Sequence, residues 1–103
     1  MIVTTGENLN GRAYEIIDIV SGSTVQSKHI GKDFLAGFKS MVGGEITSYT
    51  ELLADARSIA YSRMIENAEK IGADAVICFR FSSSSIMDGA SELLAYGTAV
   101  KFL

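Results

Sequence analysis

The residues that could bind a soft metal ion are few. The only histidine is His29, the only cysteine is Cys78, and four methionines complete the set. A closed zinc site normally takes four nitrogen or sulfur ligands at tight spacing, whereas His29 and Cys78 lie far apart in the sequence. Cys78 stands in a run of apolar residues, where a cysteine usually acts as a small buried hydrophobe. The sequence therefore indicates no metal site within one chain, and leaves open a site completed across subunits by repeated copies of His29 or Cys78.

Catalytic patterns are equally weak. Cys78, or one of the serines, would need a base such as His29 beside it to act as a nucleophile. Gly43 and Gly44 resemble a phosphate-binding turn, but the lysine and the spacing of a P-loop are missing. The carboxylates show no clustered spacing like that of a calcium loop. We therefore expect a protein without catalytic machinery and without a cofactor.

One candidate binding corner remains, at the glycine pair that precedes a long predicted helix. The first N–H groups of a helix favour anions, and Tyr49 and Arg57 could add a hydroxyl and a fork of donors there. Two hypotheses follow for the corner formed by Gly43, Gly44, Tyr49 and Arg57. It either receives Asp33 or a C-terminal carboxylate of a neighbouring subunit as a salt bridge, or it binds a small anionic ligand.

The long helix that would position Arg57 is expected over about 23 residues. Ser48 and Glu51 match a capping box at its start, and Gly72 suits the left-handed residue that follows its end. A broad apolar arc is expected to face a sheet: Leu52, Leu53, Ala56, Ile59, Ala60, Met64 and Ile71. A second strip lies beside that arc and requires another partner, either a short helix or a neighbouring subunit: Ala54, Tyr61, Ile65 and Ala68.

Strands are predicted on both sides of this helix. Ile2–Thr5 is expected to be a short edge strand, and Arg12–Val20 a strand buried on both faces because its apolar residues are nearly continuous. Ser21-Gly22-Ser23 is expected to turn the chain, and a short amphipathic helix is expected over Lys32–Val42. The remaining predictions are a strand at Ala75–Phe81, a polar connection that includes Ser82–Ser85, and a final strand at Glu92–Leu103 with a bulge at Gly97, the last two strands forming a hairpin.

Composition limits the remaining possibilities. At 103 residues we expect one domain over residues 1–103, and the 48% of hydrophobic residues fits a core continued across an interface. The net charge of −3, with acids and bases interspersed, gives no basic surface for nucleic acid. No run of residues has the length and apolarity of a membrane span or a signal peptide, and the single cysteine suits a reducing compartment. We therefore expect a cytoplasmic protein without nucleic-acid or membrane partners.

Five short motifs occur in order along the chain: Asp33-x-x-Ala36, Val42-Gly43-Gly44-x-x-x-Ser48-Tyr49, Ala56-Arg57, Gly72-Ala73-Asp74-Ala75-Val76 and Tyr96-Gly97-Thr98-Ala99-Val100. Together they resemble the YbjQ-like family, a set of small bacterial proteins without assigned function that are often described as heavy-metal-binding domains. The resemblance implies an α/β (α+β) subunit, in which a small mixed sheet of two β-α-β-like halves packs on one long and one short helix. It also implies a ring of five subunits, so we expect a homo-oligomer, preferably a pentamer.

The strand that follows the motif Gly72-Ala73-Asp74-Ala75-Val76 departs from the family pattern. Family members usually carry glycine and several acidic residues in and after it, whereas residues 78–83 here read Cys-Phe-Arg-Phe-Ser-Ser. The resemblance therefore supplies neither a carboxylate site for a cation nor metal ligands at named positions. We expect a small-ligand-binding or scaffolding module, with metal binding completed across the subunit interface as the alternative.

Overall fold

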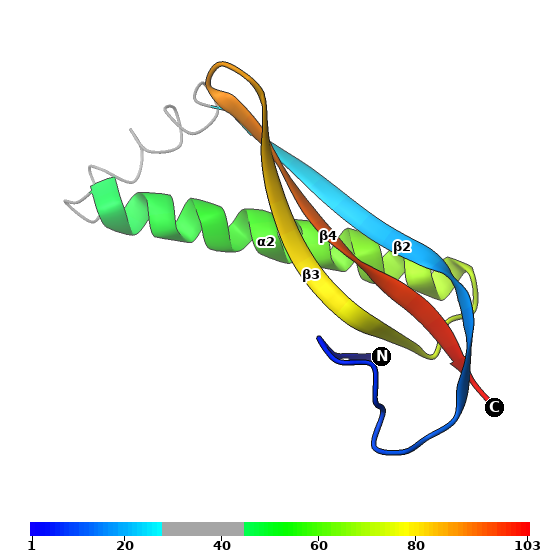
Figure 1. Cartoon of the computed structure of the whole chain (residues 1–103). Helices are drawn as coiled ribbons and strands as arrows, with labels where there is room; N and C mark the ends of the chain where they lie inside the picture. The colour runs from blue at the N-terminus through cyan, green and yellow to red at the C-terminus, as the bar shows by residue number, and fades with distance from the viewer. Residues whose placement is uncertain (28–44) are drawn as a thin grey trace.

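The computed structural model describes residues 1–27 and 45–103, which form a four-stranded mixed sheet and a long helix (Figure 1). The elements in chain order are β1 (Ile2–Val3), β2 (Tyr14–Ser27), α2 (Glu45–Lys70), β3 (Ala75–Met87) and β4 (Ala90–Phe102). The strand order is β1-β3-β4-β2, with β1 parallel to β3 and the other pairs antiparallel. The predicted α+β class with a mixed sheet is confirmed. The short helix predicted over Lys32–Val42 lies outside the described residues.

β2 continues through the residues predicted to form a turn. Ser21, Gly22 and Ser23 pair in sequence with Tyr96, Ala95 and Leu94 of β4, so the predicted turn is wrong. Gly22 explains the difference, because a Cβ atom there would overlap the backbone of Ala60 and Met64 in α2. A glycine inside a strand often marks such a close approach of another backbone.

The predicted hairpin between the last two strands is confirmed, and its loop, whose length the sequence left open, is short. The serines of residues 82–85 belong to β3 and pair with residues 91–94 of β4. Asp88 and Gly89 alone separate the strands, and Gly89 takes a φ of 79° that suits glycine. The serine run therefore forms strand, and the prediction of a polar connection there is wrong.

An irregularity predicted at Gly97 is present, but the extra residue belongs to β3. Ile77 pairs with Thr98 and Arg80 pairs with Tyr96, so Cys78 and Phe79 together face Gly97. Two residues opposite one define a β-bulge. Cys78 takes a φ of 55°, in the left-handed region that favours glycine.

α2 begins earlier than predicted and ends as predicted. It starts at Glu45, so Ser48 lies inside the helix and the predicted cap is wrong; residues 45–50 contain no glycine or proline to stop it. At the other end Gly72 has a φ of 78°. The N–H of Gly72 donates to the carbonyl of Glu69, and the N–H of Ala73 donates to the carbonyl of Ala68. These bonds satisfy carbonyls at the helix end in the Schellman arrangement.

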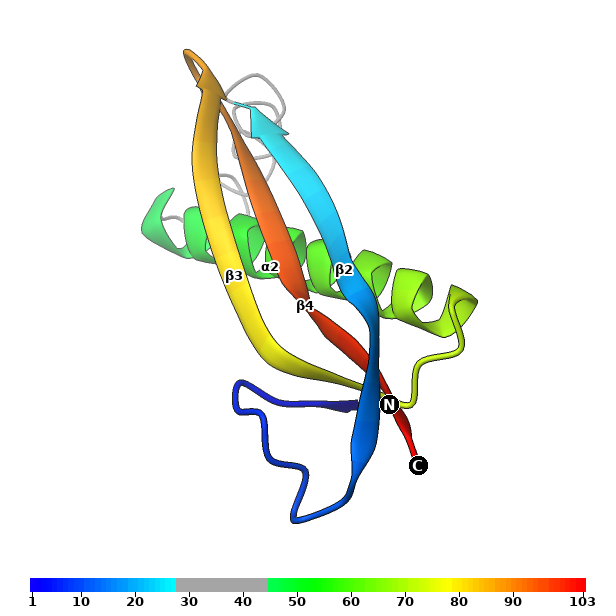
Figure 2. The ribbon, with the colours of Figure 1, turned by 45° about the vertical axis from the view of Figure 1, so that its right-hand side comes forward.

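A seam of small residues holds α2 against β2 and β4, on one face of the sheet (Figure 2). The helix contributes Ala56, Ala60, Met64 and Ala68 to its buried side, and the strands contribute Val20, Gly22, Ala95 and Ala99. Tyr61 and Ile65 also pack against this core, although the sequence had assigned them and Ala68 to a second strip. Leu53 and Ile59, which were predicted to face the sheet, are 43% and 45% exposed. The prediction is therefore confirmed for Ala56, Ala60 and Met64 and wrong for Leu53 and Ile59.

Within residues 1–27 and 45–103, the opposite face of the sheet is covered near its β1 end. There Leu9, in the segment between β1 and β2, packs with Ala75, Ile77 and Val100. Farther out along β2, Ile16 and Ile19 are 68% and 74% exposed. The prediction that this strand is buried on both faces is therefore wrong for the described residues.

Gly22→Ala tests the close approach of α2 to β2. We expect the variant to lose about 3 kcal/mol of unfolding free energy, because overpacked sites cost about 1–3 kcal/mol and occasionally more. Denaturant unfolding followed by circular dichroism measures the loss. The matched control is Gly6→Ala, where the nearest atom to a new Cβ is 3.9 Å away; its stability should stay within about 0.5 kcal/mol of the parent. Equal stability of the two variants would contradict the packing.

Candidate functional site

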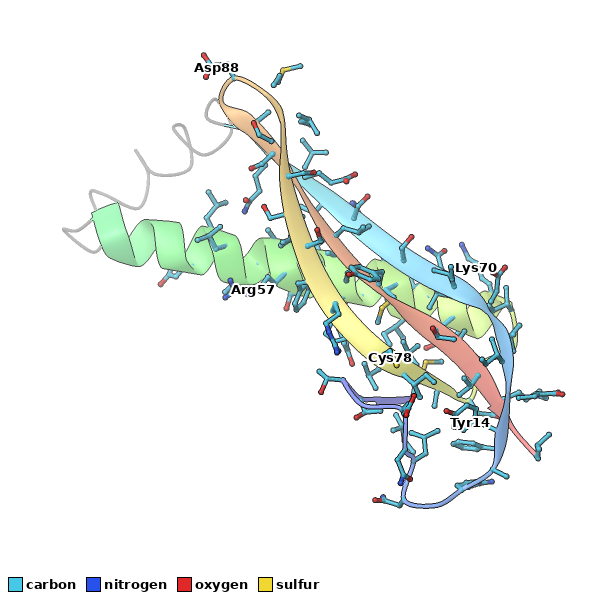
Figure 3. The ribbon with its side chains drawn as sticks, in the orientation of Figure 1. Tyr14, Arg57, Lys70, Cys78 and Asp88 are labelled. Atoms are coloured by element: carbon cyan, nitrogen blue, oxygen red, sulfur yellow. The ribbon has the colours of Figure 1, made fainter. Side chains whose placement is uncertain are left out.

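A groove lies between α2 and β3, beside the small-residue seam. Ala54, Arg57, Ser58 and Tyr61 of α2 line it together with Phe81 of β3, and its volume is ≈ 330 Å³. Figure 3 shows Arg57 on the half of α2 nearest the N-terminal end of the helix, where β3 crosses it. The groove exists because α2 packs on β2 and β4 and leaves β3 alongside.

Three aromatic rings connect the two walls of this groove. The rings of Tyr61 and Phe79 meet edge to face with centroids 5.6 Å apart, and those of Phe79 and Phe81 do so at 4.9 Å. Edge-to-face pairs at such distances are favourable and hold the rings in defined orientations. Phe81 is still 41% exposed. An apolar ligand therefore has a preformed aromatic surface to pack against.

The chemistry that this lining supports is binding. Arg57 supplies a permanent positive charge, Tyr61 and Ser58 supply hydroxyls, and the remaining surface is apolar. Sites for small molecules are typically concave and mostly apolar, with a few polar groups that fix orientation. A guanidinium at the edge of an aromatic surface suits an organic anion, since its planar fork matches a carboxylate or sulfonate.

Of the residues predicted for the binding corner, Arg57 lines the groove. Tyr49 lies two turns earlier in α2, within residues 45–50, where the structure describes the backbone only. Asp33, Gly43 and Gly44 lie outside the described residues, so the corner itself stays a prediction. The sequence missed Tyr61 and Phe81 as groove residues. The signals available were the position of Tyr61, one helical turn after Arg57, and the alternation of Phe79 and Phe81 along a strand.

A second, polar groove of ≈ 420 Å³ lies at the other side of α2, along β2. Ser21, Gly22, Ser23, Arg63, Glu66 and Asn67 line it. Arg63 donates from Nη1 to the carbonyl of Ser23 at 2.6 Å, and Asn67 donates from Nδ2 to that of Ser21 at 2.8 Å. These side chains are engaged with the backbone of β2, so this groove is chiefly a contact between helix and strand.

The structure places Cys78 on the sheet face opposite α2. Its side chain is half-buried and packs against the cluster formed by Leu9, Ala75, Ile77 and Val100. Within residues 1–27 and 45–103, no group of three or more histidine, cysteine or carboxylate side chains lies close enough together to hold a metal ion. His29 lies outside those ranges, so the structure does not test a site that uses it.

Taken together, these elements define a small α+β protein in which a four-stranded mixed sheet is crossed by one long helix, with a largely apolar groove between α2 and β3. The chain matches the model of the YbjQ_1 family, described as "Putative heavy-metal-binding", over residues 1–103. The chain therefore belongs to the YbjQ family, and the resemblance found in its motifs is confirmed.

Close relatives and one solved structure are similar to this chain. A UPF0145 protein of Thermosipho africanus is 62% identical over 102 residues, covering 98% of this chain and 94% of the relative. One from Vibrio campbellii is 58% identical over 104 residues and covers all of both chains. The crystal structure of a DUF74-family protein of unknown function from Pediococcus pentosaceus has a TM-score of 0.69 at 14% identity, over 100% of this chain and 98% of that one. That likeness shows the fold alone.

In the parts of this chain that the structure describes, no helix has the length and apolarity needed to span a membrane.

Substitutions of Cys78 test its backbone conformation. Cys78→Ala should lose roughly 1 kcal/mol, as small core truncations do. Cys78→Gly should be at least as stable as Cys78→Ala, because glycine avoids a left-handed cost of about 1–2 kcal/mol. Thermal and denaturant unfolding give the order.

The same pair of substitutions at Ser83, an exposed residue in a regular part of β3, is the control. There the alanine variant should be more stable than the glycine variant by about 0.5–1 kcal/mol. If the alanine variant is also clearly the more stable one at Cys78, the bulge conformation is contradicted.

Proposed function

We propose that the chain is a homo-oligomeric binding protein that takes a small organic anion into the groove between α2 and β3. One observation carries the proposal: the groove joins an aromatic surface, Tyr61 and Phe81, to a single guanidinium, Arg57. The ligand class follows from that lining. It has a flat or aliphatic body for the aromatic surface and a carboxylate, sulfonate or phosphate for Arg57.

The energetics favour a ligand with both parts. Exposed ion pairs contribute only about 0.2–1 kcal/mol, so a simple anion such as chloride or acetate would bind weakly at Arg57. Burial of apolar surface adds about 25 cal/mol for each Å². Affinity therefore comes mainly from contact with the rings, and the guanidinium selects the charge and the orientation of the ligand.

Exposed apolar side chains support the oligomer. On β2, Ile16, Ile19 and Val25 are all more than half exposed, and on α2 Leu53 and Ile59 are 43% and 45% exposed. Monomeric proteins rarely expose large contiguous apolar patches, and such patches commonly mark interfaces. The family resemblance favours five subunits, and the single free cysteine fits a cytoplasmic location. Arg57 would then lie either beside a ligand or beside a carboxylate of the next subunit.

Metal binding across subunits is the second candidate, and the description of the family is what favours it. Symmetry would bring together one residue from each subunit, with Cys78 or His29 as the ligand. Elemental analysis of protein purified without an affinity tag separates the two functions. Metal present in stoichiometric amount, and lost from Cys78→Ala or His29→Ala, would replace the organic anion as the ligand.

Binding of 8-anilinonaphthalene-1-sulfonate tests the groove, since this probe combines aromatic rings with a sulfonate. We expect saturable binding that weakens about fivefold in Arg57→Ala, which corresponds to about 1 kcal/mol. Phe81→Ala should weaken it at least as much, through lost contact with the ring. Fluorescence titration of the folded protein measures both changes.

Lys70→Ala is the matched control, because it removes one positive charge from the same helix outside the groove. It should leave the affinity unchanged. Binding as tight as that of the parent in both Arg57→Ala and Phe81→Ala would contradict the proposed site.

Light scattering coupled to size exclusion tests the assembly. We expect a closed oligomer, preferably of five subunits, for the parent and for the groove variants. Arg57→Ala distinguishes the two roles of that residue. Under the salt-bridge hypothesis the oligomer should weaken by about 3–5 kcal/mol, because a buried carboxylate loses its partner; under the ligand hypothesis the oligomer should persist. A well-folded monomer at micromolar concentration for the parent would contradict the assembly.

A further inference from the structure

β2 forms one edge of the sheet, and an exposed edge of this kind can pair with a strand of another molecule. In the described part of the chain it pairs only with β4. An edge strand presents unpaired N–H and C=O groups to which a strand of another molecule can bond. Exposed Ile19 and Val25 flank this edge, and long apolar edges are prone to aggregation. Proteins commonly protect such an edge with lysine or proline, and neither residue occurs in Tyr14–Ser27.

Side chains of the same chain occupy three of the groups that this edge presents. The N–H of Ile19 donates to Oδ1 of Asp18 at 2.8 Å. The carbonyls of Ser21 and Ser23 accept from Asn67 Nδ2 and Arg63 Nη1. The three bonded residues of β2 are alternate ones, the spacing at which a strand points its groups to the same side.

The spacing of the helix matches the spacing of the strand. Arg63 and Asn67 are four residues apart, so they are separated by about 6 Å along α2. Two residues of a strand span about 6.6–6.8 Å. Gly22, between the two bonded serines, lets the backbone of α2 come close enough for both side chains to reach around the edge.

We propose that Asp18, Arg63 and Asn67 close the edge of β2 to strand addition by a second copy of the chain. Copies of the chain then meet through their side chains at this edge and cannot continue the sheet from β2 of one copy into the next. Closure requires neither a bound ligand nor a particular number of subunits. It therefore stands or falls separately from the proposed anion site.

The double substitution Arg63→Ala with Asn67→Ala tests the closure. We expect larger, sheet-extended assemblies that bind thioflavin T and grow with concentration, while circular dichroism still reports the folded helix. Ser62→Ala with Glu69→Ala, at exposed positions of the same helix without bonds to β2, should assemble like the parent. Arg63→Lys with Asn67→Gln keeps a donor at both positions and should largely restore the parent behaviour.

Two further variants keep the test decisive. Asp18→Ala removes a protecting group without altering α2, and should give the same larger assemblies if the double variant fails to fold. Adding Ser23→Pro removes an outward N–H that an added strand would need, and proline is tolerated on an edge; it should abolish the larger assemblies. Assembly unchanged in Asp18→Ala and in the folded double variant, or larger assemblies that persist with Ser23→Pro, would overturn the proposal.

Discussion

The close contact between α2 and β2 determines the rest of the structure. Gly22 has no side chain, and Ala60 and Met64 lie directly against it. Ala68, Ala95 and Ala99 extend the same seam without a polar atom in their side chains. Protein interiors are close-packed, so a seam of small residues draws two elements together and fixes the rotation of the helix. The groove between α2 and β3 and the bonds from α2 to the edge of β2 both depend on this rotation of the helix.

On one side of the seam, the position of α2 leaves β3 partly uncovered. Tyr61 then meets Phe79 across the space between helix and strand, and Arg57 and Phe81 complete the groove. On the other side, the same close approach brings Arg63 and Asn67 to the backbone of β2. The anion site and the closed edge are thus two results of one packing contact, although they involve different residues and fail under different substitutions.

The sequence was sufficient where local chemistry decides the structure. Gly72 ends the helix, and the hairpin of β3 and β4 forms from residues with strand preferences. The sequence did not suffice to predict the features that tertiary packing determines. Apolar periodicity placed Ala60 and Met64 correctly against the sheet, but it also placed Leu53 and Ile59 there, because periodicity cannot tell which part of a broad arc packs most closely. Ser21-Gly22-Ser23 is predicted as a turn and the serine run as a polar connection, since their composition is typical of loops, but cross-strand pairing holds both in the sheet. Arg57 could be singled out from the sequence, whereas its groove depends on the angle between helix and sheet.

Nuclear Overhauser effects between Gly22 and α2 measure this central contact directly. In uniformly isotope-labelled protein, we predict strong effects from the Gly22 α-protons to the backbone amide proton of Met64 and to the methyl of Ala60. We predict none from Gly22 to Ile59, which points away from the seam. Absence of the Gly22 effects, together with effects that join Ala60 to Phe81 of β3, would show that the helix lies over the wrong strands and would contradict the account.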